Sequence, residues 1–398
     1  MKKLFRLLLP VAATFALFTA GCDTNGNNSN ISDGQYGYKF YTNIPDGQYT
    51  LLGNDYGAGE KIAGFTDNKG EGEFTPPAGY TSKSQIYYQM FADAQLIVAA
   101  DFSTQEAIEK YSKFTQEVGS TLDGINKAIS ATVSKSDINN FNRYDAGVKF
   151  EISEITYEVL SLALEIYSLT DGYYNPALYY NIQSFGFGGS YDFPESASDM
   201  PDDGAIAKYT DLATHFGDIR LEEAGGKYFV TKPEYTVEVE SETLSMKLDL
   251  GGIGKGYAVD CIDELFDSYG YEYGLFNFGA SSMLIKSNVQ VGDYTIELVN
   301  PRSIKRDGYI RIPARNKKLS TSGDNEQYFM LDGVRYCHII DPTTGKPVQR
   351  GIMSATVIGG GAAEDDALTT AIMCMGKDKA IKFIEEKLND RMVIFTTE

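Results

Sequence analysis

One stretch of the sequence, LDLGGIGKGYAVD at residues 248–260, combines four glycines with a lysine. The pattern indicates a strand, a glycine-rich turn and then a helix, which presents free backbone N–H groups and a positive dipole end to an anion. Lys255 adds a cation. Neither common nucleotide fingerprint fits, because Gly256 follows the lysine where a P-loop has Ser or Thr, and Tyr257 stands where a dinucleotide motif has glycine. A tight strand–helix connection without a ligand is an equal alternative.

A second stretch, AAEDDALTTAIMCMG at residues 362–376, places a carboxylate and a hydroxyl at helical spacing. Asp366 and Thr370 lie four residues apart, so they share one face of a helix. Both are suitable ligands for Mg²⁺, which usually keeps waters and substrate phosphate oxygens as its other ligands. Taken alone, the acidic residues are better explained as a favourable helix N-terminus, where each is worth roughly 0.3–1 kcal/mol.

A third stretch, RYCHIIDPTTGKPV at residues 335–348, carries a histidine near the end of an expected strand. His338 could accept a proton there, with Asp341 close by in the sequence, although a lone histidine in a strand is more often structural. The stretch KKLSTSGD at residues 317–324 reads as a small-residue turn. Its hydroxyl and N–H groups could hold phosphate or sugar oxygens, or it could be an ordinary loop.

Helices and strands must position these residues, and their mixture without regular βαβ alternation predicts an α+β fold. A capping box at Ser103 and Glu106 should open a helix that runs to about Ile129, with a possible interruption near Gly119. Two strands that flank Asp332-Gly333 should form a type I′ hairpin. Residues 84–100 should form one or two strands, and further helices are expected at about 154–169, 256–269, 365–375 and 377–388.

The composition narrows the classes of partner and cofactor. The chain has 398 residues and a formal net charge of −20, which argues against nucleic acid because phosphates need a basic surface. Its two histidines nearly exclude structural zinc, so any metal should be a hard cation held by oxygens. The cysteines after the N-terminal segment are Cys261, Cys337 and Cys374, and their odd count argues against a disulfide framework.

The N-terminus carries a targeting signal. A basic head precedes the apolar run Leu7–Ala20, which is too short to be a comfortable membrane span. The following Thr-Ala-Gly-Cys resembles a bacterial lipoprotein signal that is cleaved before a lipidated Cys22; an ordinary secretory signal is the alternative. We expect a lipid anchor in the cell membrane, with the body on the extracytoplasmic face. The expected segments are a signal peptide (1–21), a flexible tether (22–36), an extension of unknown role (37–83) and a catalytic domain (84–398).

Each motif is weak alone, but together and in this order they resemble the FAD:protein FMN transferases, the ApbE family. The matching segments are TDGYYNPA (170–177), LDLGGIGKGYAVD (248–260), LFNFGA (275–280), LSTSGD (319–324), HIIDPTTGKPV (338–348) and DDALTTAIMCMG (365–376). The resemblance covers about residue 120 to the C-terminus. It implies a single catalytic domain of the ApbE type, which binds FAD and Mg²⁺ and moves FMN onto a Thr or Ser of an acceptor protein, releasing AMP.

The resemblance also implies roles for individual residues. Those implied to contact FAD are Met90, Tyr173, Tyr174, Asn175, Asp249, Lys255, Ser320 and Ile340. The implied metal ligands are Asp366, Thr370 and the backbone carbonyl of Gly252. His338 matches a histidine at the reaction centre, with Asp341 as its orienter. Two positions depart from the family pattern: many relatives have Asp in place of Asn175, and Phe91-Ala92 follow Met90 where Gly-Thr is expected.

Three functions remain open at this point. The leading one is flavin transfer to an acceptor flavoprotein with a Thr/Ser flavinylation motif. A Mg²⁺-dependent FAD pyrophosphatase would use the same site, with water as the attacking group. A flavin-binding lipoprotein without turnover is the third, and Asn175 keeps it open. The joint presence of Lys255, His338, Asp366 and Thr370 weighs against the third.

Overall fold

The computed structural model describes residues 39–44, 50–51, 60–61, 79–189, 191–287, 294–303 and 308–397. The expected signal peptide, the tether with Cys22 and most of the extension at residues 37–83 lie outside these ranges. Among the helices of the described ranges, none combines the length and apolar composition needed to cross a bilayer.

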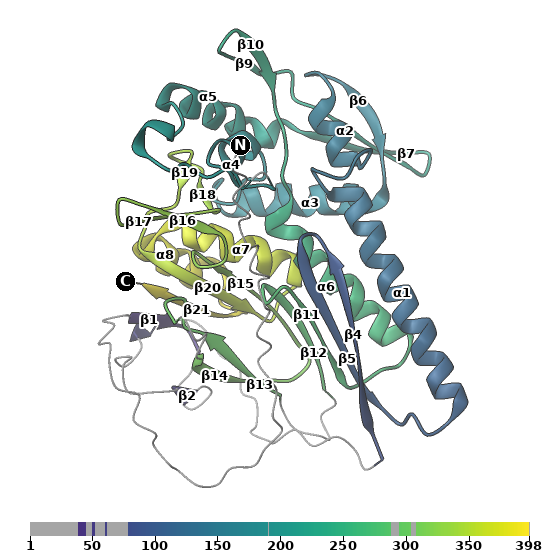
Figure 1. Ribbon diagram of the computed structural model, residues 1–398. Coiled ribbons are helices and arrows are strands. Elements are labelled where there is room, and N and C mark those ends of the chain that lie inside the picture. Colours follow the sequence, from purple (N-terminus) through teal and green to yellow (C-terminus); the bar gives the residue numbers. More distant parts are fainter. Residues whose placement is uncertain are drawn as a thin grey trace, which may run out of the picture.

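A nine-stranded sheet forms the centre of the molecule (Figure 1). Its strand order is β3 (Glu60–Lys61), β1 (Lys39–Thr42), β21 (Met392–Thr397), β20 (Ile352–Ile358), β15 (Lys317–Gly323), β12 (Ser282–Lys286), β11 (Gly274–Phe278), β5 (Ala92–Ala100) and β4 (Thr81–Gln89). Neighbours are antiparallel except for β1 and β3. Every residue of β20 and β21 is buried, because both faces of the sheet are covered there.

Two apolar cores lie on opposite faces of this sheet. Consecutive strand residues such as Leu275 and Phe276 belong to different cores, because side chains alternate across a strand. The larger core lies against the helices α1 (Gln105–Ile129), α3 (Glu154–Leu169), α6 (Gly251–Ser268), α7 (Ala362–Met375) and α8 (Lys377–Lys387). The smaller core lies against the hairpin of β13 (Tyr294–Val299) and β14 (Gly308–Ala314), to which β2 (Thr50–Leu51) pairs.

Small elements complete the described chain. They are the helices α2 (Asp137–Arg143), α4 (Tyr179–Ser184), α5 (Asp203–Ala213), η1 (Ala197–Asp199) and η2 (Thr214–Asp218), the sheet of β6 (Lys149–Ile152), β8 (Lys227–Thr231) and β7 (Arg220–Ala224), and the pairs β9 (Thr236–Val239) with β10 (Glu242–Ser245), β16 (Tyr328–Leu331) with β17 (Val334–Cys337), and β18 (Ile340–Asp341) with β19 (Lys346–Pro347). The predicted α+β fold is confirmed.

Local sequence signals located several elements well. The expected helix at 154–169 is α3, and the hairpin at Asp332-Gly333 forms with positive φ at both residues, 50° and 80°, as a type I′ turn requires. The capping box was misplaced: the side chain of Thr104, not Ser103, accepts the amide of Ala107, and α1 runs unbroken past Gly119. Packing stabilises α1 there, because its apolar stripe lies in the larger core.

Candidate active site

The glycine-rich stretch is helical from its first glycine. The sequence predicted a turn and a helix from Gly256, whereas α6 begins at Gly251. The carboxylate of Asp249 accepts the amide of Gly251 at 2.8 Å and so satisfies one free N–H of the first turn. Glycine disfavours a helix by about 1 kcal/mol relative to alanine. A tertiary contact must therefore stabilise this beginning.

That contact is the close approach of α6 to α7. A Cβ atom at Gly256 would lie 2.1 Å from the carbonyl oxygen of Ala362, so only glycine fits there. A Cβ atom at Gly252 would lie 3.5 Å from the hydroxyl of Thr370. The glycines thus let the two helices meet at backbone distance, and this brings the two conspicuous motifs of the sequence together.

The predicted metal ligands lie at this contact. The carboxylate of Asp366 accepts the amide of Gly256 at 3.1 Å, the same amide that a regular helix directs at the carbonyl of Gly252. Thr370 stands one turn further along α7, beside Gly252. Among the described residues, no three His, Cys, Asp or Glu side chains form a metal cluster. The expected set is of another kind, since it joins one carboxylate, one hydroxyl and one carbonyl, the hard ligands of Mg²⁺.

The surroundings of Asp366 suit a cation. Its side chain is 2% exposed, and burial raises its pKa, although Lys255 and the Gly256 amide offset part of the rise. None of the ion pairs between described residues involves this carboxylate. The hydroxyl of Tyr174 is also buried without a partner in the described structure, and its pKa is raised by burial and then by Asp366 and Asp249. A bound Mg²⁺ would compensate the buried negative charge.

Lys255 is the positive centre of the site. Its charge lowers the pKa of His338 and works against the burial that raises the pKa of Asp249 and Asp366. Its ammonium group donates to the carbonyl of Gly251 at 3.2 Å. Asp249, His338 and Asp366 come from three distant parts of the sequence, and all three interact electrostatically with this lysine. Lys255 could therefore hold an anionic group beside a metal.

The sequence predicted His338 near the end of a strand, whereas in the structure it directly follows the strand β17. Its backbone amide donates to the carbonyl of Gln327 at 3.0 Å, and its Nδ1 lies 3.4 Å from the same oxygen. The ring is half-buried and meets Phe187 edge to face. Burial, and then the charge of Lys255, lower its pKa to about 4. The ring is thus neutral at pH 7, and a proton on Nδ1 leaves Nε2 free to accept another.

Asp341 does not orient this histidine. One of its oxygens accepts the amide and hydroxyl of Thr343 at 2.9 and 2.7 Å, and the other binds Nε of Arg350 at 2.7 Å. Of the described contacts of Asp341, none reaches His338. The predicted orienting role is therefore wrong, because the carboxylate is already used by the turn after β18 and by an arginine that sequence spacing did not identify.

The segment Tyr173–Asn175 does not line one surface. Tyr173 and Asn175 border a pocket of about 130 Å³, whereas Tyr174 is buried in the core, where Asp366 and Asp249 raise its pKa further. The amide of Asn175 donates to the carbonyl of Ala213 at 3.0 Å, and its oxygen accepts the amide of Ala177 at 2.9 Å. An aspartate could not donate the first of these bonds. The departure from the family pattern thus has a local structural reason.

Three predicted cofactor contacts have different surroundings. Met90 lies in the β4–β5 turn, and its sulfur would lie 3.8 Å from a Cβ atom at Gly254, so it borders α6. Ile340 is 4% exposed, inside the larger core. Ser320 is fully buried within β15 rather than in a turn, and its hydroxyl contacts Ser282 and the carbonyl of Ala362. The Ser320 hydroxyl is therefore already bonded within the fold, and a cofactor contact by this residue stays a prediction.

The sequence reasoning missed Ser322. Its hydroxyl lies 2.8 Å from that of Thr369 and 3.3 Å from that of Thr370, the predicted metal ligand. The available signal was the alternation of a strand: Ser320 and Ser322 lie two residues apart on β15 and so face α7 together. The segment KKLSTSGD, predicted to be a turn, is therefore largely the strand β15.

Because Lys255 lowers the pKa of His338, we expect the Lys255→Met substitution to raise the pKa of His338 from about 4 towards its ordinary value of 6.5. NMR titration of the imidazole C–H signals measures both values directly, since the chain has two histidines. A His338→Gln variant assigns the signal. An ordinary pKa in the wild-type protein, unchanged in the lysine variant, would show that the ring and the lysine do not interact.

Solved structures share this fold. The flavin transferase ApbE from Vibrio cholerae matches with a TM-score of 0.64 at 23% identity, over 79% of this chain and 93% of that one. The ApbE protein from Thermotoga maritima matches with a TM-score of 0.64 at 24% identity, over 79% and 94% of the two chains. The chain therefore has the fold of the flavin transferases, a class of group-transfer enzymes.

Sequence comparison gives the family. A FAD:protein FMN transferase from Vibrio cholerae is 27% identical over 300 residues, which is 74% of this chain and 83% of that relative. Another from Treponema pallidum is 26% identical over 293 residues, 72% and 77% of the two chains. The ApbE family model matches residues 90–395, most of the chain. The chain belongs to the ApbE family and is an enzyme of the transferase type.

Proposed function

We propose that the protein transfers FMN from FAD to a Thr or Ser hydroxyl of an acceptor protein and releases AMP in a Mg²⁺-dependent reaction. The observation that carries this proposal is the close approach of α6 to α7, where Asp366 accepts the amide of Gly256, the residue next to Lys255, and Thr370 lies beside Gly252. Curated relatives that match about three quarters of the chain are named FAD:protein FMN transferases, which supports the same reaction.

The reaction breaks one P–O bond of the FAD pyrophosphate and forms another. The acceptor oxygen attacks the phosphorus on the FMN side, its proton passes to Nε2 of His338, and AMP leaves with the bridging oxygen. The imidazole is unprotonated at pH 7, because its pKa is about 4. A bound pyrophosphate would raise this pKa towards the operating pH, where a general base is most effective. Lys255 and the α6 N-terminus hold the anionic pyrophosphate and stabilise the charge that develops on AMP.

The residues at the α6–α7 contact fit a magnesium ion. Asp366, Thr370 and the carbonyl of Gly252 would hold it, and when bound it would neutralise pyrophosphate charge. The carboxylate of Asp249 accepts the amide of Gly251 and so fixes the beginning of α6. The chain's own contribution is thus a rigid frame for the ion and the anionic substrate.

A hydrolase would cleave the same bond with water. Reaction of FAD and Mg²⁺ in H₂¹⁸O, with a candidate acceptor present, separates the alternatives by mass spectrometry of the products. Transfer gives AMP and acceptor-bound FMN without ¹⁸O. Hydrolysis at the same phosphorus gives free FMN that carries one ¹⁸O, and a binding protein returns intact FAD. Labelled free FMN as the main product would contradict transfer.

We also propose that Cys22 is lipidated and holds the enzyme on the extracytoplasmic face of the cell membrane. The support is the apolar segment that ends in Thr-Ala-Gly-Cys, followed by a polar tether long enough to separate the domain from a bilayer. Expressed in a bacterium, the wild-type protein should partition into Triton X-114, and Cys22→Ala should not. Equal partitioning of the two proteins, with the same processed mass, would contradict lipidation at this residue.

A further inference from the structure

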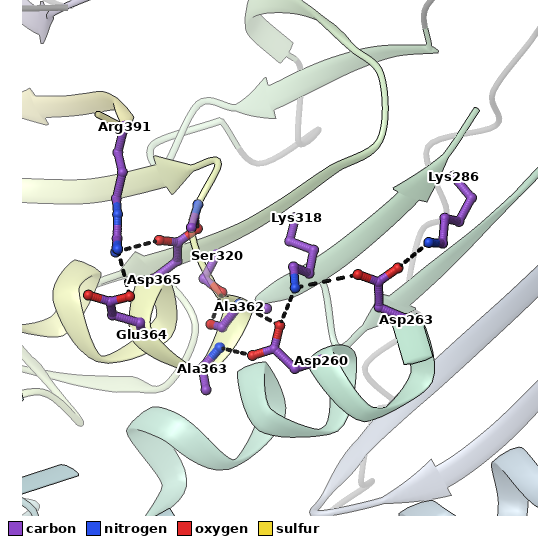
Figure 2. A network of polar contacts seen from close by, with 11 residues as sticks. Asp260, Asp263, Lys286, Lys318, Ser320, Ala362, Ala363, Glu364, Asp365 and Arg391 are labelled. Atoms are coloured by element: carbon purple, nitrogen blue, oxygen red, sulfur yellow. Dashed lines mark hydrogen bonds and ion pairs between the residues drawn. The ribbon is translucent and has the colours of Figure 1, made fainter. Parts of the chain in front are cut away.

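The N-terminus of α7 is capped by a side chain from another helix. Its own cap residue, Gly361, has no side chain, so the first amides of the helix need an outside acceptor. The carboxylate of Asp260 on α6 supplies it, since one oxygen accepts the amide of Ala362 at 2.9 Å and the other that of Ala363 at 2.8 Å (Figure 2). The two helices are thereby tied where α7 begins.

This tie continues a regular pairing of the two helices. Gly252 lies beside Thr370, Gly256 beside Asp366 and Asp260 beside Ala362. Each step of four residues towards the C-terminus of α6 therefore matches a step of four residues towards the N-terminus of α7. Two of these pairs contain the candidate metal ligands. The third contains a carboxylate that the proposed reaction does not use.

We propose that Asp260 is a positioning residue that sets the register of α7 against α6 and so places Asp366 and Thr370 for the metal. This inference rests on the proposed function. An α-helix moves as a rigid body over one or two turns, so a change at Ala362 is passed to Asp366 one turn later and to Thr370 after two. Mutation of an outer residue that orients a metal ligand typically weakens metal affinity by about 10–100-fold.

Asp260 is itself held by a row of alternating charges. Lys318 binds it at 2.7 Å and also contacts Asp263, which binds Lys286 at 2.6 Å (Figure 2). Burial works to lower the pKa of Lys318, but its hydrogen bond and charge interaction with Asp260 raise the pKa above its ordinary value. The lysine therefore stays charged and fixes the carboxylate that caps α7.

Two further residues, Ser320 and Arg391, hold the same turn of α7. The hydroxyl of Ser320 donates to the carbonyl of Ala362 at 3.1 Å, and Arg391 binds Glu364 at 2.6 Å and Asp365 at 3.1 Å. These contacts keep α7 folded and in place on the sheet when the cap is removed. None of them comes from α6, so the register of α7 against α6 rests on Asp260 and on the bond from the Gly256 amide to Asp366.

The test is Mn²⁺ affinity, measured by electron paramagnetic resonance on the FAD-free protein. We expect Asp260→Asn, which keeps one acceptor oxygen but loses the charge, to raise the dissociation constant at least about tenfold. Asp260→Ala should raise it further. Asp263 also contacts Lys318 and has no described bond to α7, so Asp263→Asn is the matched control. In this variant the dissociation constant should stay within about twofold of the wild type.

A second control separates positioning from general stability. Asp202 caps α5 by accepting the amide of Ala205 at 2.9 Å, so Asp202→Ala removes a comparable cap far from the metal ligands. It should lower the melting temperature without weakening Mn²⁺ binding. Unchanged affinity in Asp260→Asn, equal weakening in Asp202→Ala, or no Mn²⁺ binding by the wild-type protein would each overturn the proposal. Mn²⁺ binding without AMP release from FAD would instead contradict the proposed reaction.

Discussion

Asp366→Ala should lower Mg²⁺-dependent release of AMP from FAD by about three orders of magnitude. Metal stabilisation of a phosphoryl transition state is worth several kcal/mol, and each 1.36 kcal/mol corresponds to about a tenfold change in rate. The carboxylate is buried, with a raised pKa and no ion pair among the described residues, so metal binding is the function that best explains its position. Turnover at a series of Mg²⁺ concentrations measures the effect.

The Asp366→Ala variant should remain folded. The variant loses the bonds from the Gly256 amide and from the side chains of Ser281 and Ser282. This loss is offset because a buried carboxylate is removed as well. Asp378→Asn is the matched control, since Asp378 is an exposed acid in the first turn of the next helix. An unchanged Mg²⁺ dependence in Asp366→Ala, with a normal melting temperature, would remove Asp366 from the ligand set.

The second large effect is expected at the base. His338→Ala should bind FAD within about twofold of the wild type but transfer FMN about 10²–10⁴-fold more slowly, the usual contribution of a general base. The neutral, half-buried ring is suited to accept the acceptor's proton. Single-turnover transfer rates measure the chemical step, and flavin fluorescence measures binding.

The other histidine of the chain provides the control. His215 binds Asp218 at 2.6 Å and stacks on Tyr235 with ring centroids 3.8 Å apart, so it belongs to a separate surface cluster. His215→Ala should leave transfer unchanged. If His338→Ala transferred FMN at a near-normal rate, proton removal would have to be assigned to another group or to solvent.

Features that depend on neighbouring residues could be predicted from the sequence. The apolar spacing of α3 and the Asp332-Gly333 turn are local signals, and the structure confirms both. The helical face shared by Asp366 and Thr370 was also readable, because four-residue spacing fixes it whenever a helix forms.

Features that depend on distant residues could not be predicted. Glycines favour a turn, yet α6 is helical from Gly251 because α7 packs directly on its backbone. Asp341 was assigned to the nearest candidate in sequence, His338, but it binds Arg350. The small residues of KKLSTSGD indicated a turn, but the segment is strand β15, paired with β12 and β20, and this pairing directs the Ser320 side chain.

The most direct measurement of the central proposal is the intact mass of a candidate acceptor after incubation with the enzyme, FAD and Mg²⁺, together with the amounts of AMP and free FMN. We predict that the acceptor gains one FMN for each AMP released, that EDTA abolishes the gain, and that little free FMN forms. An unmodified acceptor with equal amounts of AMP and free FMN would contradict transfer and establish a pyrophosphatase. Intact FAD would contradict catalysis at this site altogether.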